Sequence, residues 1–276
     1  MRNLYGLHLG GSQEGLKELT AQAKELGADI VQAFASDPQI YGVPKISSEF
    51  KGLKDSVKIV IHSPYWVSFF NPKVRKLHMA FIKNLDVNLA TSESPIYYVT
   101  HTGTPPSDMS KAECRRCTED FLAELYSKMR LKSTVIAIEN SAFPVTKYNI
   151  DLEVLEQVKE TFPQTELCLD TEHAYAAGED ILAIRWLNYK LIHMNAIPWY
   201  VNGGEGLDRH SWSLLSKGKP VIYDVIDSLR GFEDKWIIME RRDPSLSLID
   251  LVDVKNRLED AIVDREEGTD FGAAQA

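Results

Sequence analysis

The chain has 276 residues, of which 31 are Lys or Arg and 40 are Asp or Glu, giving a formal net charge of −9 at pH 7. This length suits one α/β barrel and is too short for two large domains. No run of eighteen apolar residues occurs, which excludes a long apolar membrane span. An acidic balance taken alone argues against nucleic-acid binding, although divalent cations held by carboxylates reverse the charge locally.

The chain has three cysteines, Cys114, Cys117 and Cys168, an odd number without framework spacing. Cys114 and Cys117 form a C-x-x-C in a charged, helix-like stretch. No second pair follows, so we expect neither a redox nor a zinc role for them. The N-terminal residues enter a strand-like segment at once, so we expect no signal peptide. A reducing, cytoplasmic setting is the simplest expectation.

Short apolar runs, typical of buried parallel strands, alternate along the chain with longer amphipathic stretches. The expected strands are Leu4–Leu9, Ile30–Ala35, Lys58–His62, Ile96–His101, Thr134–Glu139, Glu166–Asp170, Lys190–Met194 and Trp236–Glu240. Helical patterns lie between them, as in Gly15–Leu26 and Asp151–Phe162. Eight strands with crossover helices predict one domain, a closed parallel (β/α)8 TIM barrel over residues 1–264. Residues 265–276 are acidic and then small, and we expect a disordered tail there.

An open, doubly wound sheet is the main alternative fold, since it uses the same strand and helix patterns. Such sheets carry a Gly-x-Gly-x-x-Gly fingerprint after the first strand when they bind dinucleotides. Here Gly10-Gly11-Ser12 lacks that spacing and predicts only a turn. The sequence therefore favours the barrel.

Polar side chains gather where the expected strands end, which is where a barrel carries its reactive groups. The strand ends and the loops after them supply His8, His62, His101, Glu139, Asp170, His173, His193, Asp208, His210 and Glu240. His78 alone among the seven histidines lies elsewhere, in a helix-like stretch, and we expect a structural role for it.

Five of these six histidines, all but His8, and the four carboxylates lie together on one rim, and this mixture points to metal ions. Without cations the carboxylates would repel one another and the buried polar groups would need other partners. Imidazole nitrogen and carboxylate oxygen are the ligands that zinc takes in catalytic sites. Nine ligands are too many for one tetrahedral ion and suit two or three ions that share a carboxylate. Clustered divalent ions are an established device for phosphoester cleavage.

Several short motifs lie at these strand ends. They are His-x-Pro-Tyr at His62–Tyr65, His-x-Gly at His101–Gly103, Glu-Asn at Glu139-Asn140, Cys-Leu-Asp-Thr-x-His-Ala at Cys168–Ala174, Ala177-Gly178, and Asp-Arg-His at Asp208–His210. In this order and at this spacing, the set resembles endonuclease IV over nearly the whole chain.

The resemblance implies three divalent ions, zinc by preference, with manganese also compatible with such ligands. It places the first ion on His62, His101 and Glu139. Glu139 bridges to a second ion, completed by Asp170, His193 and Glu240. The third ion falls to His173, Asp208 and His210.

The same resemblance implies an apurinic/apyrimidinic endodeoxyribonuclease, with Glu139 and Glu240 as catalytic residues. Endonuclease IV hydrolyses the phosphodiester on the 5′ side of an abasic site in duplex DNA, leaves a 3′-hydroxyl and trims blocked 3′ ends in base excision repair. We expect duplex DNA with such lesions as the partner. No exposed apolar stripe stands out, so we expect a monomer.

Residues expected to bind DNA follow from the same likeness, with departures. Tyr65 and Trp66 occupy the position of the family's pair of residues that insert into the duplex. The alternative is that Trp66, Phe69 and Phe70 pack under the loop. Gln39 stands where the family usually presents an inserting arginine. Arg209 is a candidate phosphate contact, as are the two arginines at 241 and 242, with ion-paired or solvated arginines as the alternative.

Two other functions compete with this one. A sugar isomerase or epimerase of the xylose isomerase-like barrel group would use a single ion on Glu139, Asp170, His193 and Glu240. It would have no use for the remaining histidines and Asp208. A DNA-binding barrel without catalysis would be expected to lose ligands, yet none is missing.

Overall fold

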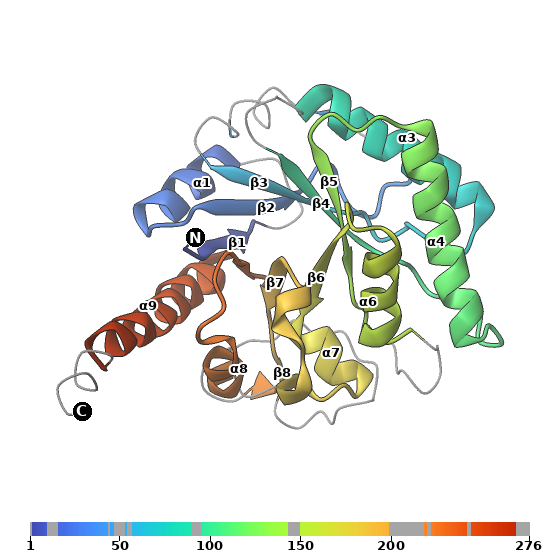
Figure 1. Cartoon of the computed structure of the whole chain (residues 1–276). Coiled ribbons are helices and arrows are strands. Elements are labelled where there is room, and N and C mark those ends of the chain that lie inside the picture. The colour runs from blue at the N-terminus through green and yellow to red at the C-terminus, as the bar shows by residue number, and fades with distance from the viewer. Residues whose placement is uncertain are drawn as a thin grey trace.

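The computed structural model describes residues 2–9, 16–43, 45–46, 53, 57–89, 95–142, 150–198, 218–219, 222–241 and 244–268, with the backbone alone at 197–198, 218–219 and 260–268. Eight parallel strands close into a barrel in the order β1-β10-β7-β6-β5-β4-β3-β2 (Figure 1). They are β1 (Leu4–His8), β2 (Ile30–Phe34), β3 (Lys58–His62), β4 (Ile96–His101), β5 (Thr134–Glu139), β6 (Glu166–Asp170), β7 (Leu191–Met194) and β10 (Trp236–Met239). The predicted barrel is confirmed, and each predicted strand agrees to within one residue at either end.

Helices surround the barrel and cover the outer faces of its strands (Figure 1). They are α1 (Leu16–Glu25), α3 (Pro72–Leu89), α4 (Lys111–Lys128), α6 (Leu152–Thr161), α7 (Thr171–Ala177), α8 (Ile222–Leu229) and α9 (Pro244–Gly268), with the short 3-10 helices η1 (Ile181–Ala183) and η2 (Trp186–Asn188). No helix in the described ranges is both long enough and apolar enough to cross a membrane.

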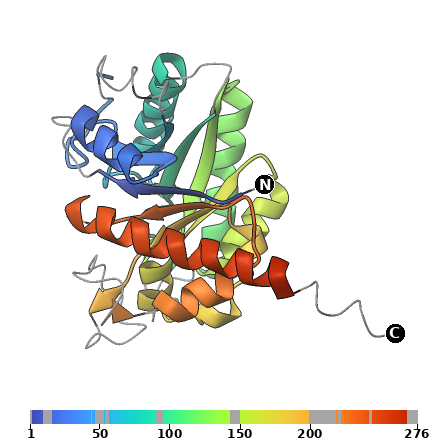
Figure 2. The same ribbon diagram turned by 90° about the vertical axis from the view of Figure 1, so that its left-hand side faces the viewer.

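Helix boundaries follow local capping chemistry. Asp151 accepts a hydrogen bond from the backbone N–H of Val154 and so caps α6 at its first turn. Ser110 and Glu113 form a reciprocal capping box at the start of α4. The long helix α9 runs beside β1, as Figure 2 shows, and packs against β1 and β10. It continues to Gly268, past the boundary that the sequence places at residue 264.

A two-stranded antiparallel pair, β8 (Ile197–Pro198) and β9 (Gly218–Lys219), lies beyond the end of β7 and was not predicted from the sequence. It links the two ends of the long segment that follows His193. The residues between these strands, 199–217, lie outside the described residues.

Two apolar clusters divide the core between the two faces of the barrel wall. The larger one lies between the strands and the helices and includes Tyr5, Phe81, Phe121, Leu155 and Ile237. The inner one fills the barrel with Ile30, Val60, Tyr97, Val99, Ala137, Cys168, Leu191, Trp236 and Ile238. Because strand side chains alternate between faces, the residue two positions after an inner one points inward as well. Those positions are Gln32, His62, His101, Glu139, Asp170, His193 and Glu240.

Candidate metal centre

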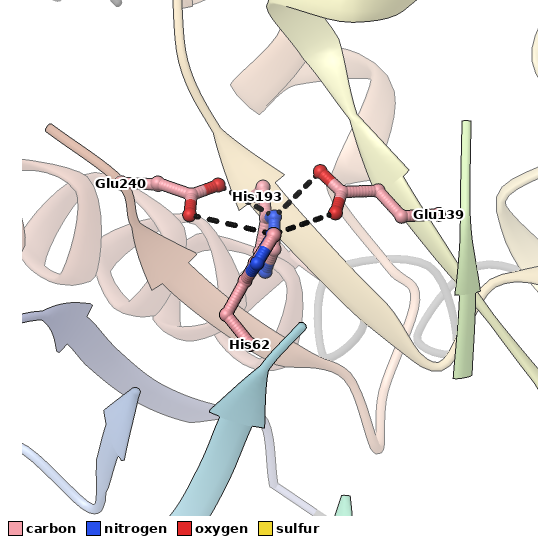
Figure 3. Close-up of side chains that lie close together, drawn as sticks. All are labelled: His62, Glu139, His193 and Glu240. Carbon is pink, nitrogen blue, oxygen red and sulfur yellow. Dashed lines mark hydrogen bonds and ion pairs between the residues drawn. The ribbon is translucent and has the colours of Figure 1, made fainter. Parts of the chain in front are cut away.

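Four buried side chains from four different strands meet at the carboxyl end of the barrel. His62 ends β3, Glu139 ends β5, His193 lies in β7 and Glu240 follows β10. One possible ligand atom from each lies within 4.8 Å of the others. Figure 3 shows both imidazoles between the two carboxylates. Buried histidines and carboxylates with converging ligand atoms form a donor set that fits a divalent transition-metal ion.

A second group shares one residue with the first. His101 ends β4 and His173 lies in α7, and their ligand atoms meet that of Glu139 within the same 4.8 Å limit. His101 is the more open member, with about a quarter of its side chain exposed, at 24%. The strand ends therefore bring together two histidine–carboxylate groups around one common carboxylate.

Glu139 is that common carboxylate, and its two oxygens face different histidines. Oε2 lies 3.0 Å from Nε2 of His62 and 3.3 Å from Nε2 of His101. Oε1 lies 3.0 Å from Nδ1 of His193 and 3.5 Å from Nδ1 of His173. Nδ1 of His173 also faces the carbonyl oxygen of Asn140 and therefore carries a proton, so His193 is the histidine whose nitrogen could share a cation with Oε1. With His62 and His101 on the Oε2 side, the carboxylate has the geometry required to bridge two cations.

The charges at this site favour a cation. Burial alone would raise the pKa of the Glu139 carboxyl, but the imidazoles of His101 and His193 outweigh it and hold that pKa well below its usual range. Burial likewise opposes ionisation of Glu240, while His193 and then His62 bring its pKa well below the ordinary value. Both carboxylates are therefore ionised at neutral pH, and a metal ion would replace positive charge that protonated imidazoles otherwise supply.

His62 is held in the orientation that a ligand needs. Its Nδ1 lies 2.9 Å from the carbonyl oxygen of Ser63, and a carbonyl can only accept, so Nδ1 carries the proton. That leaves Nε2, which faces Glu139, as the ligand nitrogen. A metal-binding histidine commonly donates its other N–H to a carbonyl or carboxylate in this way.

Asp170 supports the site from the start of α7. Its Oδ1 accepts a hydrogen bond from the backbone N–H of His173 at 2.7 Å and so caps that helix. Its Oδ2 accepts from the side-chain amide of Asn195 at 3.1 Å. Asp170 is buried but belongs to neither of the two converging groups, so its predicted role as a ligand of the second ion stays a proposal.

Asn140, the second residue of the Glu-Asn motif, forms hydrogen bonds with the end of β6. The side-chain oxygen of Asn140 accepts from the backbone N–H of Asp170 at 2.7 Å, and its amide donates to the Asp170 carbonyl at 3.0 Å. Its own carbonyl lies 3.2 Å from Nδ1 of His173. Asn140 thus ties the end of β5 to the end of β6 and fixes the position of His173.

Steric constraints explain why glycine occupies two of the motif positions. Gly103, in the His-x-Gly motif, has φ of 80°, and a Cβ there would lie 2.8 Å from the carbonyl oxygen of Val67. Gly178 ends α7 in the left-handed conformation with φ of 91°. L side chains rarely adopt such angles, and glycine adopts them without strain. Gly103 shapes the loop that follows His101, and Gly178 ends the helix that carries His173.

Tyr65 and Trp66 differ in their exposure. Tyr65 is 67% exposed, and its ring lies 5.6 Å from that of Phe34, which contacts His62. Trp66 is partly buried against the outer core, and its indole N–H donates to the carbonyl of Ile40 at 2.9 Å. The Trp66 indole therefore supports the loop after β2, while Tyr65 stands open beside the site.

Some of the remaining predicted site residues lie in the described part of the chain, and others lie outside it. Gln39 is exposed in a turn, where its N–H bonds to the side chain of Asp37 at 2.9 Å. Arg241 is buried and forms an ion pair with buried Asp250 of α9, which supports the ion-paired interpretation of this arginine over a phosphate contact. Three residues proposed as ligands or DNA contacts, Asp208, Arg209 and His210, lie outside the described residues, as does Arg242.

One residue that the sequence patterns did not single out lies within the site. Gln32 is fully buried in β2, and its amide contacts His8, His193 and Glu240. The available signal was a polar residue in the middle of the apolar run Ile30–Phe34. His8, noted only as a strand-end residue, also lies at the site, with Nδ1 3.4 Å from Glu240 Oε1.

The sequence has recognisable relatives. A family model described as a xylose isomerase-like TIM barrel matches residues 20–270. A protein of Aquifex aeolicus strain VF5 named "Probable endonuclease 4" is 28% identical over 187 residues, covering 64% of this chain and 66% of that relative. The matched region thus spans slightly less than two thirds of that relative's own length.

Solved structures share the fold. Endonuclease IV from Thermus thermophilus is 22% identical with a TM-score of 0.69, over 93% of this chain and 99% of that chain. The 3-keto-D-glucoside 4-epimerase from E. coli is 14% identical with a TM-score of 0.63, over 94% of this chain and 99% of that chain. At these identities both likenesses concern the fold alone.

Proposed function

The chain belongs to the xylose isomerase-like TIM barrel family, and we propose that it is a metal-dependent endonuclease acting on duplex DNA that contains abasic sites. In this proposal it hydrolyses the phosphodiester on the 5′ side of the lesion, leaves a 3′-hydroxyl and trims blocked 3′ ends in base excision repair. The observation that carries the proposal is Glu139, whose two carboxylate oxygens face separate pairs of histidines. The similarity to proteins named as probable endonuclease 4 supports the same direction.

The proposed ligands form three sets. By the resemblance to endonuclease IV, His62, His101 and Glu139 would hold one ion, and Glu139 would share a second with Asp170, His193 and Glu240. The structure supports shared use of Glu139, which lies in both groups of converging ligand atoms: one with His62, His193 and Glu240, the other with His101 and His173. A third set combines His173 with Asp208 and His210. Zinc is the proposed metal, since imidazole and carboxylate ligands without cysteine are typical of its catalytic sites. Clustered divalent ions activate a water molecule and neutralise charge on the phosphate.

The protein's own residues would hold the cations, position the ligands and contact the DNA. Glu139 and Glu240 supply buried negative charge that keeps cations in the site, and Asp170 and Asn140 hold His173 in place. Tyr65 is exposed at the mouth of the site, where an aromatic ring is suited to stacking in the gap left by a missing base. Bound cations would also offset the acidic net charge next to the DNA.

A single-metal sugar isomerase or epimerase is the alternative, and the fold of the E. coli epimerase is compatible with it. Such an enzyme would need Glu139, Asp170, His193 and Glu240 and no further nitrogen ligands. His62 and His101 lie against the second oxygen of Glu139, and one ion does not require them there. This arrangement favours the endonuclease.

The test is incision of a labelled duplex that carries one abasic-site analogue. We expect zinc-loaded protein to cut on the 5′ side of the analogue, and prolonged chelation to abolish the cut. An undamaged duplex of the same sequence is the control substrate. An intact lesion duplex with zinc-loaded protein, together with turnover of a ketose or aldose in the presence of one divalent ion, would reject the endonuclease in favour of the alternative.

A further inference from the structure

Gln32 occupies an unusual place for a neutral polar side chain. It lies in the middle of β2, points into the barrel and is fully buried. Its amide nitrogen lies 2.9 Å from Oε1 of Glu240, and its amide oxygen lies 2.8 Å from Nε2 of His193. One side chain therefore contacts two proposed ligands that arrive from different strands.

The direction of these hydrogen bonds follows from the chemistry of the partners. The amide nitrogen of Gln32 is the atom that faces Glu240, and its N–H donates to a carboxylate oxygen, which accepts. The amide oxygen is then the atom that faces His193. An amide oxygen only accepts, so Nε2 of His193 must carry the proton.

This hydrogen bond settles which nitrogen of His193 serves the centre. With its proton on Nε2, the ring presents Nδ1, which lies 3.0 Å from Oε1 of Glu139 and 2.7 Å from Oε2 of Glu240. The nitrogen that faces both carboxylates is thus the one available to a cation. An outer partner that fixes the tautomer and orientation of a metal-binding histidine is a general feature of such sites.

The second hydrogen of the amide also has an acceptor. Nδ1 of His8 lies 3.0 Å from the Gln32 amide nitrogen, and the His8 ring packs edge-on against Phe34 with centroids 5.0 Å apart. The amide thus uses both hydrogens and its oxygen inside the barrel. A buried amide whose donors and acceptor are all used holds its partners in one arrangement.

We propose that Gln32 is a positioning residue of the metal centre: it keeps the proton of His193 on Nε2, so that Nδ1 points to the metal, and it holds the carboxylate of Glu240 beside that nitrogen. The inference rests on the metal site of the proposed function. It does not depend on which substrate the centre acts on.

Gln32→Met is the direct test, because methionine has similar length and shape and lacks both the amide donor and the acceptor. We expect the affinity for zinc, measured by competition with a chelating dye, to fall about 10–100-fold, the usual effect of losing an outer-shell partner. Val31→Ala is the matched control. Val31 is the preceding residue of the same strand and packs in the outer core, so this variant loses stability and keeps its zinc affinity.

A second measurement needs no variant. In zinc-loaded wild-type protein, the ¹⁵N chemical shifts of the histidine rings report which nitrogen bears the proton, and His193→Gln identifies the His193 signals. We expect His193 to be protonated at Nε2 and metal-bound at Nδ1. The opposite assignment, or unchanged zinc affinity in Gln32→Met, overturns the inference. Wild-type protein that binds zinc and does not cut abasic DNA rejects the proposed function and leaves the role of Gln32 standing. Wild-type protein that binds no zinc rejects both.

Discussion

Oε1 of Glu139 and Nδ1 of His193 lie 3.0 Å apart, although the strands that carry them, β5 and β7, are separated in the barrel by β6. Both side chains are fully buried. The contact exists because inner-facing positions at the carboxyl ends of all the strands converge on one axis. The other carboxylate oxygen of Glu139 faces His62 and His101, so one residue joins both groups of histidines.

Glu139→Gln tests that joint role. The substitution keeps the shape but replaces one oxygen with an NH2 group, which repels a cation and cannot serve as its ligand. We expect incision of abasic DNA to fall by more than about 100-fold, since loss of an outer-shell partner alone costs about 10–100-fold. The control is Glu166→Gln. Glu166 begins β6, at the end of the barrel away from the metal site, and pairs with Lys159, so its replacement should leave incision unchanged. Equal activity of wild type and Glu139→Gln would contradict the assignment.

Zinc should stabilise the folded protein, because the two ligand groups are assembled only in the fold. At a free zinc concentration 100-fold above the dissociation constant, one site adds about 2.7 kcal/mol to the free energy of unfolding. Thermal melts of chelated protein with and without added zinc measure this directly. A shift as large in Glu139→Gln as in wild type would show that the zinc binds elsewhere.

Tyr65→Ala and Trp66→Ala should separate DNA binding from stability. Tyr65 is exposed, so its loss should change the free energy of unfolding by about 0.5 kcal/mol at most. It should weaken binding to abasic duplex by about 1–3 kcal/mol if the ring stacks in the gap. Trp66 packs on the core and bonds to Ile40, so its loss should cost about 2 kcal/mol of stability, less than a fully buried aromatic. Denaturant titrations and binding to matched intact and abasic duplexes read out the two effects.

The reverse pattern would assign insertion into the duplex to Trp66 instead of Tyr65. Loss of stability in Tyr65→Ala with unchanged DNA binding would remove Tyr65 from the proposed contacts. Unchanged stability in Trp66→Ala would show that the indole does not support the loop after β2.

The buried ion pair of Arg241 and Asp250 should be required for stability, since it joins the end of β10 to α9. Asp250→Ala leaves a buried guanidinium without its carboxylate and should cost about 3–5 kcal/mol. Replacing both, Arg241→Met with Asp250→Leu, should restore most of that loss, because no buried charge remains. Denaturant unfolding of the single and double variants decides between this role and a phosphate contact, for which Asp250→Ala would be close to neutral.

The barrel and its ring of polar strand ends were predictable, because buried parallel strands produce apolar runs that end where the chemistry begins. His62, His101 and Glu139 meet in the structure because each ends its strand on the inner face. The role of Gln32 was not predictable. It depends on which side chains of β7 and β10 reach β2 across the barrel, and no local pattern carries that information.

Short helices and strands were not predicted, for a different reason. Helix α7 begins with the residue that follows β6, so the apolar period changes without a loop to mark the change. The pair β8 and β9 has two residues in each strand, too few for a period of two to appear. Trp66 lies close to His62 in sequence and next to exposed Tyr65, yet its indole turns to the core. Sequence adjacency therefore gave no guide to its direction.

His78 gives a test of stability against pH. It is buried among Phe69, Phe121 and Tyr98, with Nε2 2.8 Å from the Tyr98 hydroxyl. This agrees with the structural role expected from its place in a helix. Burial lowers the pKa of His78 to about 3, so the folded protein keeps this imidazole neutral while the unfolded chain protonates it near the ordinary value of about 6.5.

The sign of the effect follows from this depressed pKa. The stability that neutral His78 contributes is fully present above about pH 6.5 and is lost as the pH falls toward 3, because the unfolded state binds the extra proton. Between about pH 7.5 and 5.5 the difference amounts to about 1.4 kcal/mol for one such group. His78→Gln has no proton to gain and keeps an amide that can bond to Tyr98. The free energy of unfolding of wild-type protein should therefore fall by about 1.4 kcal/mol more than that of the variant over this range, since both proteins carry the same metal-site histidines. Parallel pH profiles would show that His78 is protonated in the folded protein, against the burial seen here.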